Sequence, residues 1–417
     1  MKTIVLDDDP TGTQSVTGAI VLLRSDVESL VAALSAQDSV YVQTNSRALA
    51  EAESVALIER IRADGRAAAS RLGEEVRFVL RGDSTLRGHV FAETEVLMDD
   101  ESVMLFVPAF PDGGRTTLDG VHRVQIGDEV LPAHETEYAK DPVFPFINGD
   151  LAAYVAEKSS RPAVLVDLAA VRDGGLASAL LAAPAGAVVV PDALTDDDIR
   201  LIAAAVDEAA AARRIVVRSA SPLAAHLAGV ASTGLLPVPV SREEGRVLLV
   251  CGSHTAGATA QLSAVAAEYG EPVVVDTSSA LADPAAAGRR AAAAVRERVA
   301  SGAPLAFVTT ERERSAAHNT LQHGERVMSA LTTAVREILD DVSVVVAKGG
   351  ITSADVARVG IGAERARVLG QILPGVSLWS VRAHDGRELL YAVVPGNVGG
   401  PSTLVDVLSA VGLEAAA

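Results

Sequence analysis

The sequence contains little of what disulfide-stabilised, metal-binding and nucleic-acid-binding proteins require. Cys251 is the only cysteine among 417 residues, so a disulfide within the chain and a cysteine-rich zinc site are both excluded. The eight histidines show none of the paired spacings of transition-metal sites, so we expect no dedicated metal ligands. Aromatic residues make up 3% of the chain, which leaves little material for stacking nucleic-acid bases. This composition fits a reducing compartment, and we expect a cytoplasmic protein.

Long apolar runs and positive charge are also scarce. No stretch approaches the ~20 apolar residues that cross a bilayer, and the apolar start of the chain meets Asp7, Asp8 and Asp9 at once, unlike a signal peptide. The formal net charge of -18 repels nucleic acid. We therefore expect no membrane and no nucleic-acid partner. An anionic substrate must be bound by local positive charge or by backbone N–H groups.

The sequence does contain enough hydrophobic residues, 49%, for a large core. A chain of 417 residues exceeds one ordinary core, so we predict two domains with a cleft between them. The segment 229–245 contains Gly234, Pro237 and Pro239 without long apolar periodicity, which is typical of a linker. We place the two domains at residues 1–235 and 244–417.

Runs of β-branched residues alternate with helix-forming stretches throughout the chain. This pattern predicts an α/β fold in which each domain is a mostly parallel sheet flanked by helices. In the first half we expect strands at residues 3–6, 19–23, 40–43, 76–80, 103–107, 163–167, 187–190 and 214–218, with helices such as 51–72 and 196–212. In the second half we expect strands at residues 246–250, 272–276, 305–309, 344–347, 376–381 and 389–393. Ligands in such folds bind where strands end and helices begin, so the loops at these points are the candidate sites.

Polar loops follow the predicted strands of the first half. Residues 7–14 place carboxylates together after the first strand, which indicates either a ligand or cation site or an acidic turn with an Asx cap. Residues 81–89 bring two arginines beside Asp83. The arginines could clamp a substrate carboxylate while Asp83 acts as an acceptor or base, or the segment could be a solvated helix cap. Loop 44–47, taken alone, is an ordinary N-cap. The proline and glycine residues of loop 108–117 fix its backbone and let a ligand approach closely, and a structural corner is equally compatible with them.

Glycine-rich loops with hydroxyl groups follow strands of the second half, at residues 251–259, 348–355 and 395–403. Glycines expose backbone N–H groups at close range, so a phosphate cradle is the natural prediction. There is no Walker A sequence and no clean G-x-G-x-x-G, which disfavours P-loop and dinucleotide folds. A hydrolase triad of Ser253, His254 and Asp276 is disfavoured because Val250 stands where the nucleophile elbow G-x-S-x-G needs glycine.

Together these loops resemble the four-carbon acid sugar kinase family over nearly the whole chain. The matching segments are D-D-x-T-G at 8–12, D-S-T-L-R-G at 83–88, the P-A-F-P and D-G turns within 108–120, G-S-x-T within 252–259, K-G-G-x-T-S at 348–353 and P-G-N-x-G-G at 395–400. Asp7, Gln14 and Arg81 depart from the pattern common in the family, so the resemblance does not name the sugar.

The resemblance implies an N-terminal substrate domain and a C-terminal nucleotide domain, with ATP and Mg2+ acting at their interface. The small-molecule substrate would be an acidic sugar of the threonate, erythronate or 3-oxo-tetronate type. The nucleotide-binding residues that it implies are Ser253, Gly349, Gly350, Thr352, Gly396 and Gly399. The substrate-binding residues that it implies are Asp8, Asp9, Asn45, Arg81, Asp83, Ser84 and Arg87. A homodimer is compatible with the sequence.

The expected reaction is in-line transfer of the γ-phosphoryl group of ATP to a terminal hydroxyl of the sugar acid. Asp8 or Asp83 would accept the hydroxyl proton, and the sequence does not separate the two. One alternative is a non-catalytic two-lobe binder that uses the same loops for affinity alone. Another is a metal-dependent phosphate-ester hydrolase, in which the acidic loop holds the metal and water attacks.

Overall fold

The computed structural model describes residues 1–240, 245–312, 321–396 and 398–413. The chain divides into two compact units, Met1–Ala231 (unit 1) and Ser232–Ala417 (unit 2). The first domain was predicted to end at residue 235, and the predicted start of the second, residue 244, lies outside the described residues. Within the described ranges, no helix combines the length and the apolar character needed to span a membrane.

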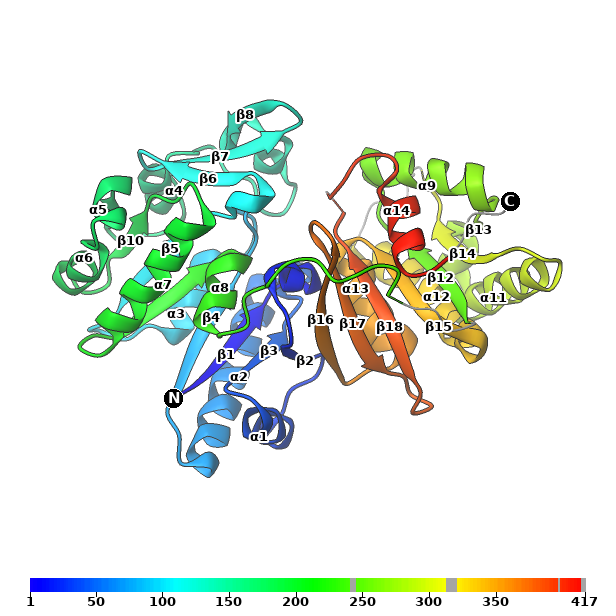
Figure 1. Ribbon diagram of the computed structural model, residues 1–417, viewed down its shortest axis with the longest axis horizontal. Coiled ribbons are helices and arrows are strands. Elements are labelled where there is room, and N and C mark those ends of the chain that lie inside the picture. The colour runs from blue at the N-terminus through cyan, green and yellow to red at the C-terminus, as the bar shows by residue number, and fades with distance from the viewer. Residues whose placement is uncertain (241–244, 313–320, 397, 414–417) are drawn as a thin grey trace. The chain divides into compact units, whose positions relative to one another are not determined.

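Unit 1 is built on a sheet of parallel strands in the order β2-β3-β1-β4-β11-β5-β10-β9 (Figure 1). The strands are β1 (Lys2–Asp7), β2 (Ile20–Leu22), β3 (Ser39–Gln43), β4 (Val76–Arg81), β5 (Val103–Val107), β9 (Ala163–Val166), β10 (Val188–Pro191) and β11 (Ile215–Ser219). The helices are α1 (Val27–Ala36), α2 (Glu51–Leu72), α3 (Val90–Leu97), α4 (Leu151–Lys158), α5 (Leu168–Arg172), α6 (Leu176–Ala182), α7 (Asp196–Ala210) and α8 (Ser221–Leu227). Strand β5 is buried along its whole length, as expected for a central strand covered on both faces.

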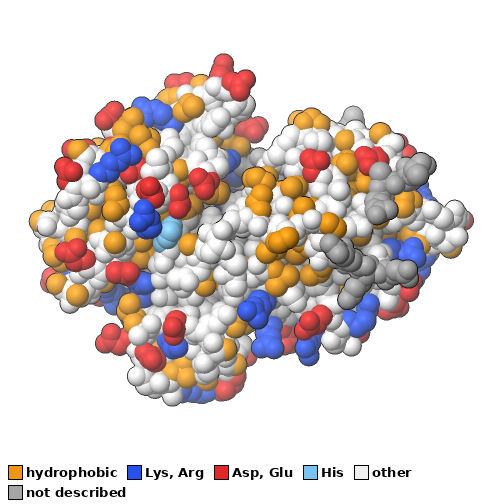
Figure 2. Space-filling model, in the orientation of Figure 1, with side chains coloured by type: hydrophobic (Ala, Val, Ile, Leu, Met, Phe, Trp, Pro, Cys, Tyr) orange, Lys and Arg blue, Asp and Glu red, His pale blue; other side chains and the backbone are white. Residues whose placement is uncertain are grey.

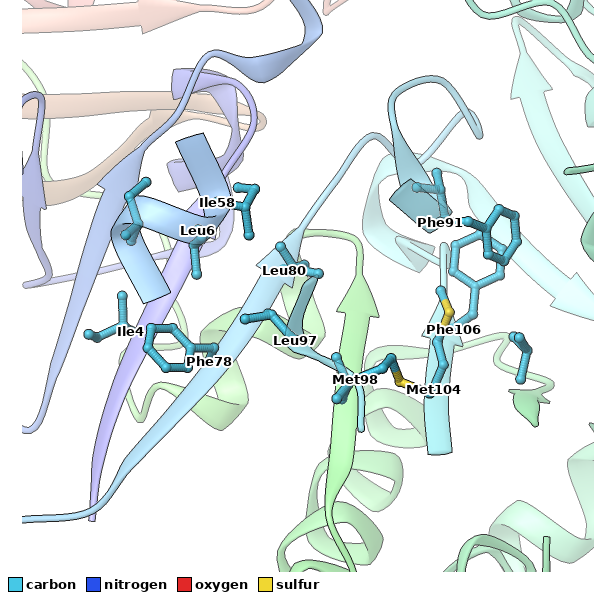
Figure 3. Packing of buried hydrophobic residues seen from close by; sticks show 14 of the residues in the cluster. Ile4, Leu6, Ile58, Phe78, Leu80, Phe91, Leu97, Met98, Met104 and Phe106 are labelled. Carbon is cyan, nitrogen blue, oxygen red and sulfur yellow. The ribbon is translucent and has the colours of Figure 1, made fainter. Parts of the chain in front are cut away.

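The core of unit 1 fixes which way the charged ends of β1 and β4 point. Ile4 and Leu6 of β1 and Phe78 and Leu80 of β4 lie in one buried cluster with Ile58 of α2 (Figure 3). Side chains alternate along a strand, so the final residues of β1 and β4 project from the opposite face of the sheet. Those final residues are charged and paired directly across the two strands. The apolar periodicity of the strands therefore sets up a charged pair at their ends.

A small antiparallel sheet, β6-β7-β8, is inserted between β5 and α4. Its strands are β6 (Arg115–Leu118), β7 (Val121–Ile126) and β8 (Glu129–Pro132). The sequence analysis assigned no strands here. Their short length and the glycines at the turns hide the alternating pattern, and residues 108–117 were interpreted only as a rigid loop.

Unit 2, in its described part, has a sheet in the order β13-β14-β12-β15-β18-β17-β16. The strands are β12 (Arg246–Cys251), β13 (Val273–Val275), β14 (Leu305–Thr310), β15 (Val342–Lys348), β16 (Arg365–Leu373), β17 (Val376–Arg382) and β18 (Glu388–Val394). The helices are α9 (Ala256–Tyr269), α10 (Thr277–Ala282), α11 (Pro284–Ala300), α12 (Leu321–Ile338), α13 (Gly350–Asp355) and α14 (Thr403–Ala410). Strands β13, β14, β12, β15 and β18 run parallel to one another. Strand β17 is antiparallel to both β18 and β16.

The predicted α/β class, with mostly parallel sheets flanked by helices, is confirmed. Every strand predicted in the sequence analysis coincides with a strand of the structure, and the predicted helix at 51–72 is α2. Strand β16 was not predicted. On the visible face of unit 1, Lys and Arg side chains are interspersed with Asp and Glu rather than gathered by sign (Figure 2). On that face, an anionic ligand would therefore depend on local groups.

Candidate active site

A cluster of charged residues in unit 1 lies at the carboxyl ends of β3, β1, β4 and β11, which are neighbours in the sheet. These strands are parallel, so the loops that follow them meet at one edge. The residues brought together there are Asp7, Asp8, Asp9, Arg47, Arg81, Asp83, Arg87 and Arg218. The structure thus brings together the two charged loops predicted in the first half.

Arg81, the last residue of β4, is buried and forms hydrogen bonds with the acidic loop. Its Nη1 lies 3.2 Å from Asp7 Oδ1, 2.9 Å from Asp8 Oδ1 and 3.4 Å from the carbonyl oxygen of Asp9. The contact with Asp7 follows from strand register, because these two residues are opposite each other on β1 and β4. Arg81 is only 4% exposed. Its guanidinium therefore neutralises carboxylates of the protein, and direct substrate binding by Arg81 stays a prediction.

Arg47 links the same loop to the turn after β4. Its Nη2 donates to Asp9 Oδ2, its Nε lies 3.4 Å from Asp8 Oδ2, and its Nη1 lies 3.8 Å from Asp83 Oδ2. The short 3-10 turn that carries Arg47 begins after Asn45, whose φ of 50° is left-handed. Asparagine adopts this conformation more readily than most residues, which gives Asn45 a structural reason to be there. Arg47 was not among the predicted site residues, although it belongs to loop 44–47, which follows a predicted strand.

Arg218 is a buried cation at the end of β11, 2% exposed. Its Nη1 donates to Glu93 Oε2 of α3, and its Nη2 lies 3.8 Å from Asp8 Oδ2. Ser54 Oγ donates to the other oxygen of Glu93 at 2.7 Å. Gly82 makes room for the guanidinium, because a Cβ placed there would lie 2.6 Å from Arg218 Nε. Sequence reasoning missed Arg218 and Glu93, and the available signal was a charged residue inside an otherwise apolar strand.

Asp83 has strong hydrogen-bond partners in its own turn. Arg87 Nε donates to Asp83 Oδ2 at 2.7 Å, and Thr85 Oγ1 donates to the same oxygen. Burial acts to raise the pKa of Asp83, but Arg87, Arg47 and Thr85 outweigh it and hold the pKa well below its usual range. Arg87 also lies over the Tyr138 ring, 5.1 Å from its centroid. Asp83 is thus a firmly ionised carboxylate that anchors Arg87.

The turn that contains Asp83 is held by elements that sequence reasoning had not connected to it. His122 of β7 is fully buried, with Nε2 2.8 Å from the carbonyl oxygen of Ser84 and Nδ1 3.1 Å from Thr117 Oγ1. Tyr154 of α4 donates to the carbonyl oxygen of Leu86 at 2.8 Å. Burial lowers the pKa of His122 to about 4, so the ring is neutral at physiological pH. Leu86 has a left-handed φ of 69°, and the hydrogen bond from Tyr154 helps to keep it there.

The three consecutive aspartates have different electrostatic environments. Burial raises the pKa of Asp7 to about 7, against the attraction of Arg81. Burial also raises the pKa of Asp8, with Arg47 as the strongest opposing group. Burial acts in the same direction on Asp9, but Arg47 and Arg81 outweigh it, so the pKa of Asp9 is lowered. Asp7 Oδ2 and Asp8 Oδ2 have no hydrogen-bond partner among the described residues. Asp7 and Asp8 are therefore the two carboxylates of this loop whose pKa is raised and whose Oδ2 has no hydrogen-bond partner among the described residues.

Gly12 of the acidic loop is required by close packing. A Cβ placed on it would lie 2.4 and 2.5 Å from the two carboxylate oxygens of Asp7 and 2.6 Å from Arg81 Nε. All of these groups are buried, so they cannot move aside into solvent. The glycine of the D-D-x-T-G motif thus makes space for the Asp7–Arg81 pair.

The second site lies wholly in unit 2, at the carboxyl ends of β12, β15 and β18, which are adjacent and parallel. A Cβ on Gly349 would lie 3.1 Å from Ser253 Cβ and 3.4 Å from Thr352 Oγ1. A Cβ on Gly396 would lie 3.7 Å from Ser253 Oγ. The predicted residues of all three glycine loops are therefore neighbours. Gly350 is the first residue of α13.

The hydrogen bonds of the loop after β18 orient its peptide groups. Lys348 Nζ donates a hydrogen bond to the carbonyl oxygen of Pro395 at 2.7 Å. Gln261 Nε2 of α9 donates to the carbonyl oxygens of Val398 and Gly399 at 3.0 and 3.4 Å. In a trans peptide the N–H points opposite to the C=O. The N–H groups of Gly396, Gly399 and Gly400 therefore point away from the two buried side chains, which is the arrangement of an anion-binding loop. Asn397 lies outside the described residues.

Within the described ranges, no group of three or more histidine, cysteine, aspartate or glutamate side chains is arranged to hold a metal ion. The arginines occupy the space among the carboxylates of unit 1, which explains why clustered aspartates do not form a cation cage. The residues present thus fit a metal ion only as one carried by a phosphate ligand, as is common for Mg2+.

The fold and the two sites define an α/β protein. Its first unit carries a cluster of arginine and carboxylate groups, and its second unit carries glycine-rich loops with backbone N–H groups. Residues 3–227 match a sugar-binding N-terminal domain, and residues 248–404 match a nucleotide-binding C-terminal domain. The chain therefore belongs to the family built from these two domains, the four-carbon acid sugar kinases. The resemblance found in the sequence is confirmed, and the protein is a kinase.

Two characterised relatives can be compared over different lengths. The chain is 27% identical to D-threonate kinase of Salmonella typhimurium, over 98% of each protein. It is 30% identical to D-erythronate kinase of Heliobacterium modesticaldum, over 59% of this chain and 54% of that protein. These relationships favour neither the non-catalytic binder nor the phosphate-ester hydrolase.

Two crystal structures share the fold. One is a Haemophilus influenzae protein, 17% identical, with a TM-score of 0.64 over 98% of this chain and 100% of that chain. The other, from Salmonella typhimurium, is described as a putative tRNA synthase and is 18% identical, with a TM-score of 0.68 over 98% of both chains. At such low identities these two structures show the fold alone.

Proposed function

We propose that this protein transfers the γ-phosphoryl group of ATP to a hydroxyl group of a four-carbon sugar acid. The acids named in its relatives, D-threonate and D-erythronate, are the first candidates for the acceptor. The observation that carries the proposal is the division of chemistry between the units. Unit 1 offers buried carboxylates with arginines, whereas unit 2 offers a loop whose amides point away from the buried donors Lys348 and Gln261.

Asp8 is the general base in this proposal. A base must have a free lone pair and a pKa near the working pH. Asp8 Oδ2 has no hydrogen-bond partner among the described residues, and burial raises the pKa of Asp8. Asp7 shares both features, but it belongs to β1 and is 0% exposed, whereas Asp8 lies in the loop that follows the strand. Asp83 is the weaker candidate, because Arg87 and Thr85 occupy one of its oxygens and its pKa is lowered. These differences support Asp8 over Asp83, which the sequence left equivalent.

Arg47 and Arg87 would bind the carboxylate of the sugar acid. Their side chains are 20% and 23% exposed, compared with 5% for Arg81 and 2% for Arg218. Guanidinium groups bind carboxylates with two parallel hydrogen bonds, which would fix the orientation of the sugar. Asp83 would hold Arg87 in place for this contact, while Asp9 would do the same for Arg47.

In unit 2, Ser253, Gly349, Gly350 and Thr352 would bind ATP together with the loop that contains Gly396 and Gly399. Mg2+ would arrive with the nucleotide and neutralise charge on the transferred phosphoryl group. Transfer requires the acceptor hydroxyl on unit 1 to reach the γ-phosphoryl group on unit 2. The cleft between the domains, a homodimer and a cytoplasmic location stay predictions.

The direct test measures ADP release from Mg-ATP with a panel of four- and five-carbon aldonic and oxo-aldonic acids. We expect at least one four-carbon acid to be turned over, and Asp8→Asn to lower kcat by about 100-fold or more, since general-base catalysis contributes 10²–10⁴. Asp26→Asn is the matched control. Asp26 is an exposed residue that caps α1 and belongs to none of the site loops, and asparagine caps a helix equally well.

Three results of these measurements would contradict the proposal or one of its parts. Full turnover by Asp8→Asn would refute the assignment of the base. Ligand binding with no ADP release for any acid would refute the kinase proposal, and so would release of phosphate from a sugar phosphate without ATP.

A further inference from the structure

Lys348, the last residue of β15, is a buried cation without a buried anion. Its side chain is 0% exposed. Nζ donates to the carbonyl oxygens of Pro395 and Val398 at 2.7 and 3.4 Å. Among the described residues, no carboxylate forms an ion pair with it, and none contributes to its pKa. Two carbonyl groups satisfy hydrogen-bond donors of the ammonium group but leave its charge uncompensated.

A buried ammonium group without a compensating anion destabilises the folded state. The neighbouring groups add no negative charge. Cys251 stands opposite Lys348 on β12, and burial raises the pKa of that thiol, so it is neutral. Arg312 Nη1 lies 3.7 Å from Cys251 Sγ, and its Nη2 donates to the carbonyl oxygen of Ser253. A second cation therefore stands in the same region, which favours an anionic ligand.

The position of Lys348 indicates which anion. It is followed directly by Gly349, whose Cα would lie 4.0 Å from a Cβ placed on Gly396. Both carbonyl oxygens that it binds belong to the loop whose amides point the opposite way. The ammonium group lies on the carbonyl side of this loop, where its hydrogen bonds hold the carbonyl groups and so leave the N–H groups facing the other way. The anion that fits is a polyphosphate bound at the amides.

We propose that Lys348 is a positioning residue of the nucleotide site, which holds the Pro395 and Val398 carbonyls inward and whose charge is balanced by the phosphates of a bound nucleoside di- or triphosphate. The proposal rests on the proposed kinase function, because it assumes a nucleotide at these loops. It gives a role to a residue that the resemblance to the family had left without one.

Proton uptake distinguishes this role from a purely structural one. Burial lowers the pKa of Lys348 to about 8. Near pH 8 about half of the lysines are therefore neutral without nucleotide. A phosphate anion nearby favours the charged form and raises the pKa. Binding of ADP at pH 8 should then take up about half a proton per molecule, and less at pH 7 where Lys348 is already charged.

The experiment is calorimetric titration of ADP into the full chain at pH 7 and pH 8, in magnesium-free buffers with different ionisation enthalpies. The wild type should take up protons at pH 8. Lys348→Met keeps the length of the side chain without its charge, and should abolish the uptake and weaken ADP about tenfold to a hundredfold. Adenosine lacks phosphates, so its affinity should change little. Lys158→Met, a partly exposed lysine of α4 in unit 1, is the control that should behave as wild type.

Lys348→Arg provides a second test if the methionine variant does not fold. Arginine keeps the charge and does not titrate near pH 8, so ADP should bind without proton uptake. Wild-type binding of ADP with no uptake at pH 8 would overturn the inference while leaving the kinase proposal intact. An unchanged ratio of ADP to adenosine affinity in folded Lys348→Met would overturn it as well. Failure of ADP and ATP to bind the wild type at all would instead refute the proposed function.

Discussion

Replacing Arg218 with methionine should destabilise unit 1 strongly, because the buried Glu93 then loses its arginine partner and the buried Asp8 loses one of its three arginine partners. Arg218 and Glu93 are 2% and 1% exposed, and Asp8 is 2% exposed. Removing one partner of a buried ion pair costs about 3–5 kcal/mol, since the remaining charge is neither paired nor solvated. We expect Arg218→Met to fall in the upper half of that range, because it affects both Glu93 and Asp8.

A double-mutant cycle with Glu93→Gln isolates the interaction. Glutamine removes the charge and can still accept the hydrogen bond from Ser54. The double variant should be less destabilised than the sum of the two single variants, by at least about 1 kcal/mol. The free energies of unfolding would come from urea titrations followed by far-UV circular dichroism.

Arg214→Met is the matched control, because Arg214 precedes the same strand but is 40% exposed and pairs with the exposed Asp99. A surface ion pair of this kind contributes less than about 1 kcal/mol. The reasoning fails if the two arginine variants lose equal stability or if the cycle is additive. Arg218 also lowers the pKa of Asp8 against the effect of burial. The acidic limb of kcat/KM should therefore move to higher pH in Arg218→Met and stay in place in Arg214→Met.

Three further substitutions test other parts of the structure. Gly12→Ala should cost about 1–3 kcal/mol, because its Cβ would collide with Asp7 and Arg81, whereas Gly324→Ala, which meets no atom within 4 Å, should be neutral or stabilising in thermal unfolding. The pKa of Asp7 is raised from 3.8 to about 7 on folding, so folding loses stability as pH rises from about 4 to 7. Asp7→Asn should therefore be more stable than wild type at pH 8, by at most about 4 kcal/mol, but not at pH 4, and an equal gain at both pH values would count against that pKa. Lys348→Met should raise the unfolding temperature of the nucleotide-free protein below pH 8, because it removes a buried charge, and a lowered temperature would show that the ammonium is better compensated than the contacts indicate.

The strands were predictable because most of them are short, largely apolar runs buried on both faces. Residues 103–107 and 246–250 are of this kind, and each lies within a strand of the structure. Strand β16 has alternating buried and exposed positions with arginines between them, so it has no continuous apolar run to find. The strands of the small sheet β6-β7-β8 are four to six residues long and are joined by turns that contain glycine. They too lack a continuous apolar run, so the sequence pattern did not reveal them.

Site residues could be predicted only where a polar side chain directly follows a predicted strand in the sequence. Asp8 and Asp83 stand at strand ends, and the rule that ligands bind there was enough to select them. Arg218 and Glu93 are 125 positions apart in the sequence, so their pairing depends on strand order, which a single sequence does not give. The role of Lys348 depends on carbonyl groups 47 residues away and was hidden for the same reason. The sequence also could not rank Asp8 against Asp83, because that ranking depends on burial and hydrogen bonds.

The orientation of the loop after β18 has a consequence for natural variation. Its anion-facing donors are main-chain amides, which no amino-acid replacement deletes except proline. Apart from replacements of the loop glycines, such as Gly399, where a Cβ would lie 2.0 Å from Thr403 Oγ1, inherited changes that impair the loop should therefore concentrate at Gln261 and Lys348, the two interior side chains that bind its carbonyl groups. A saturation library scored for growth on the acid sugar would then reveal intolerance at these concealed positions, while solvent-facing neighbours accept most substitutions.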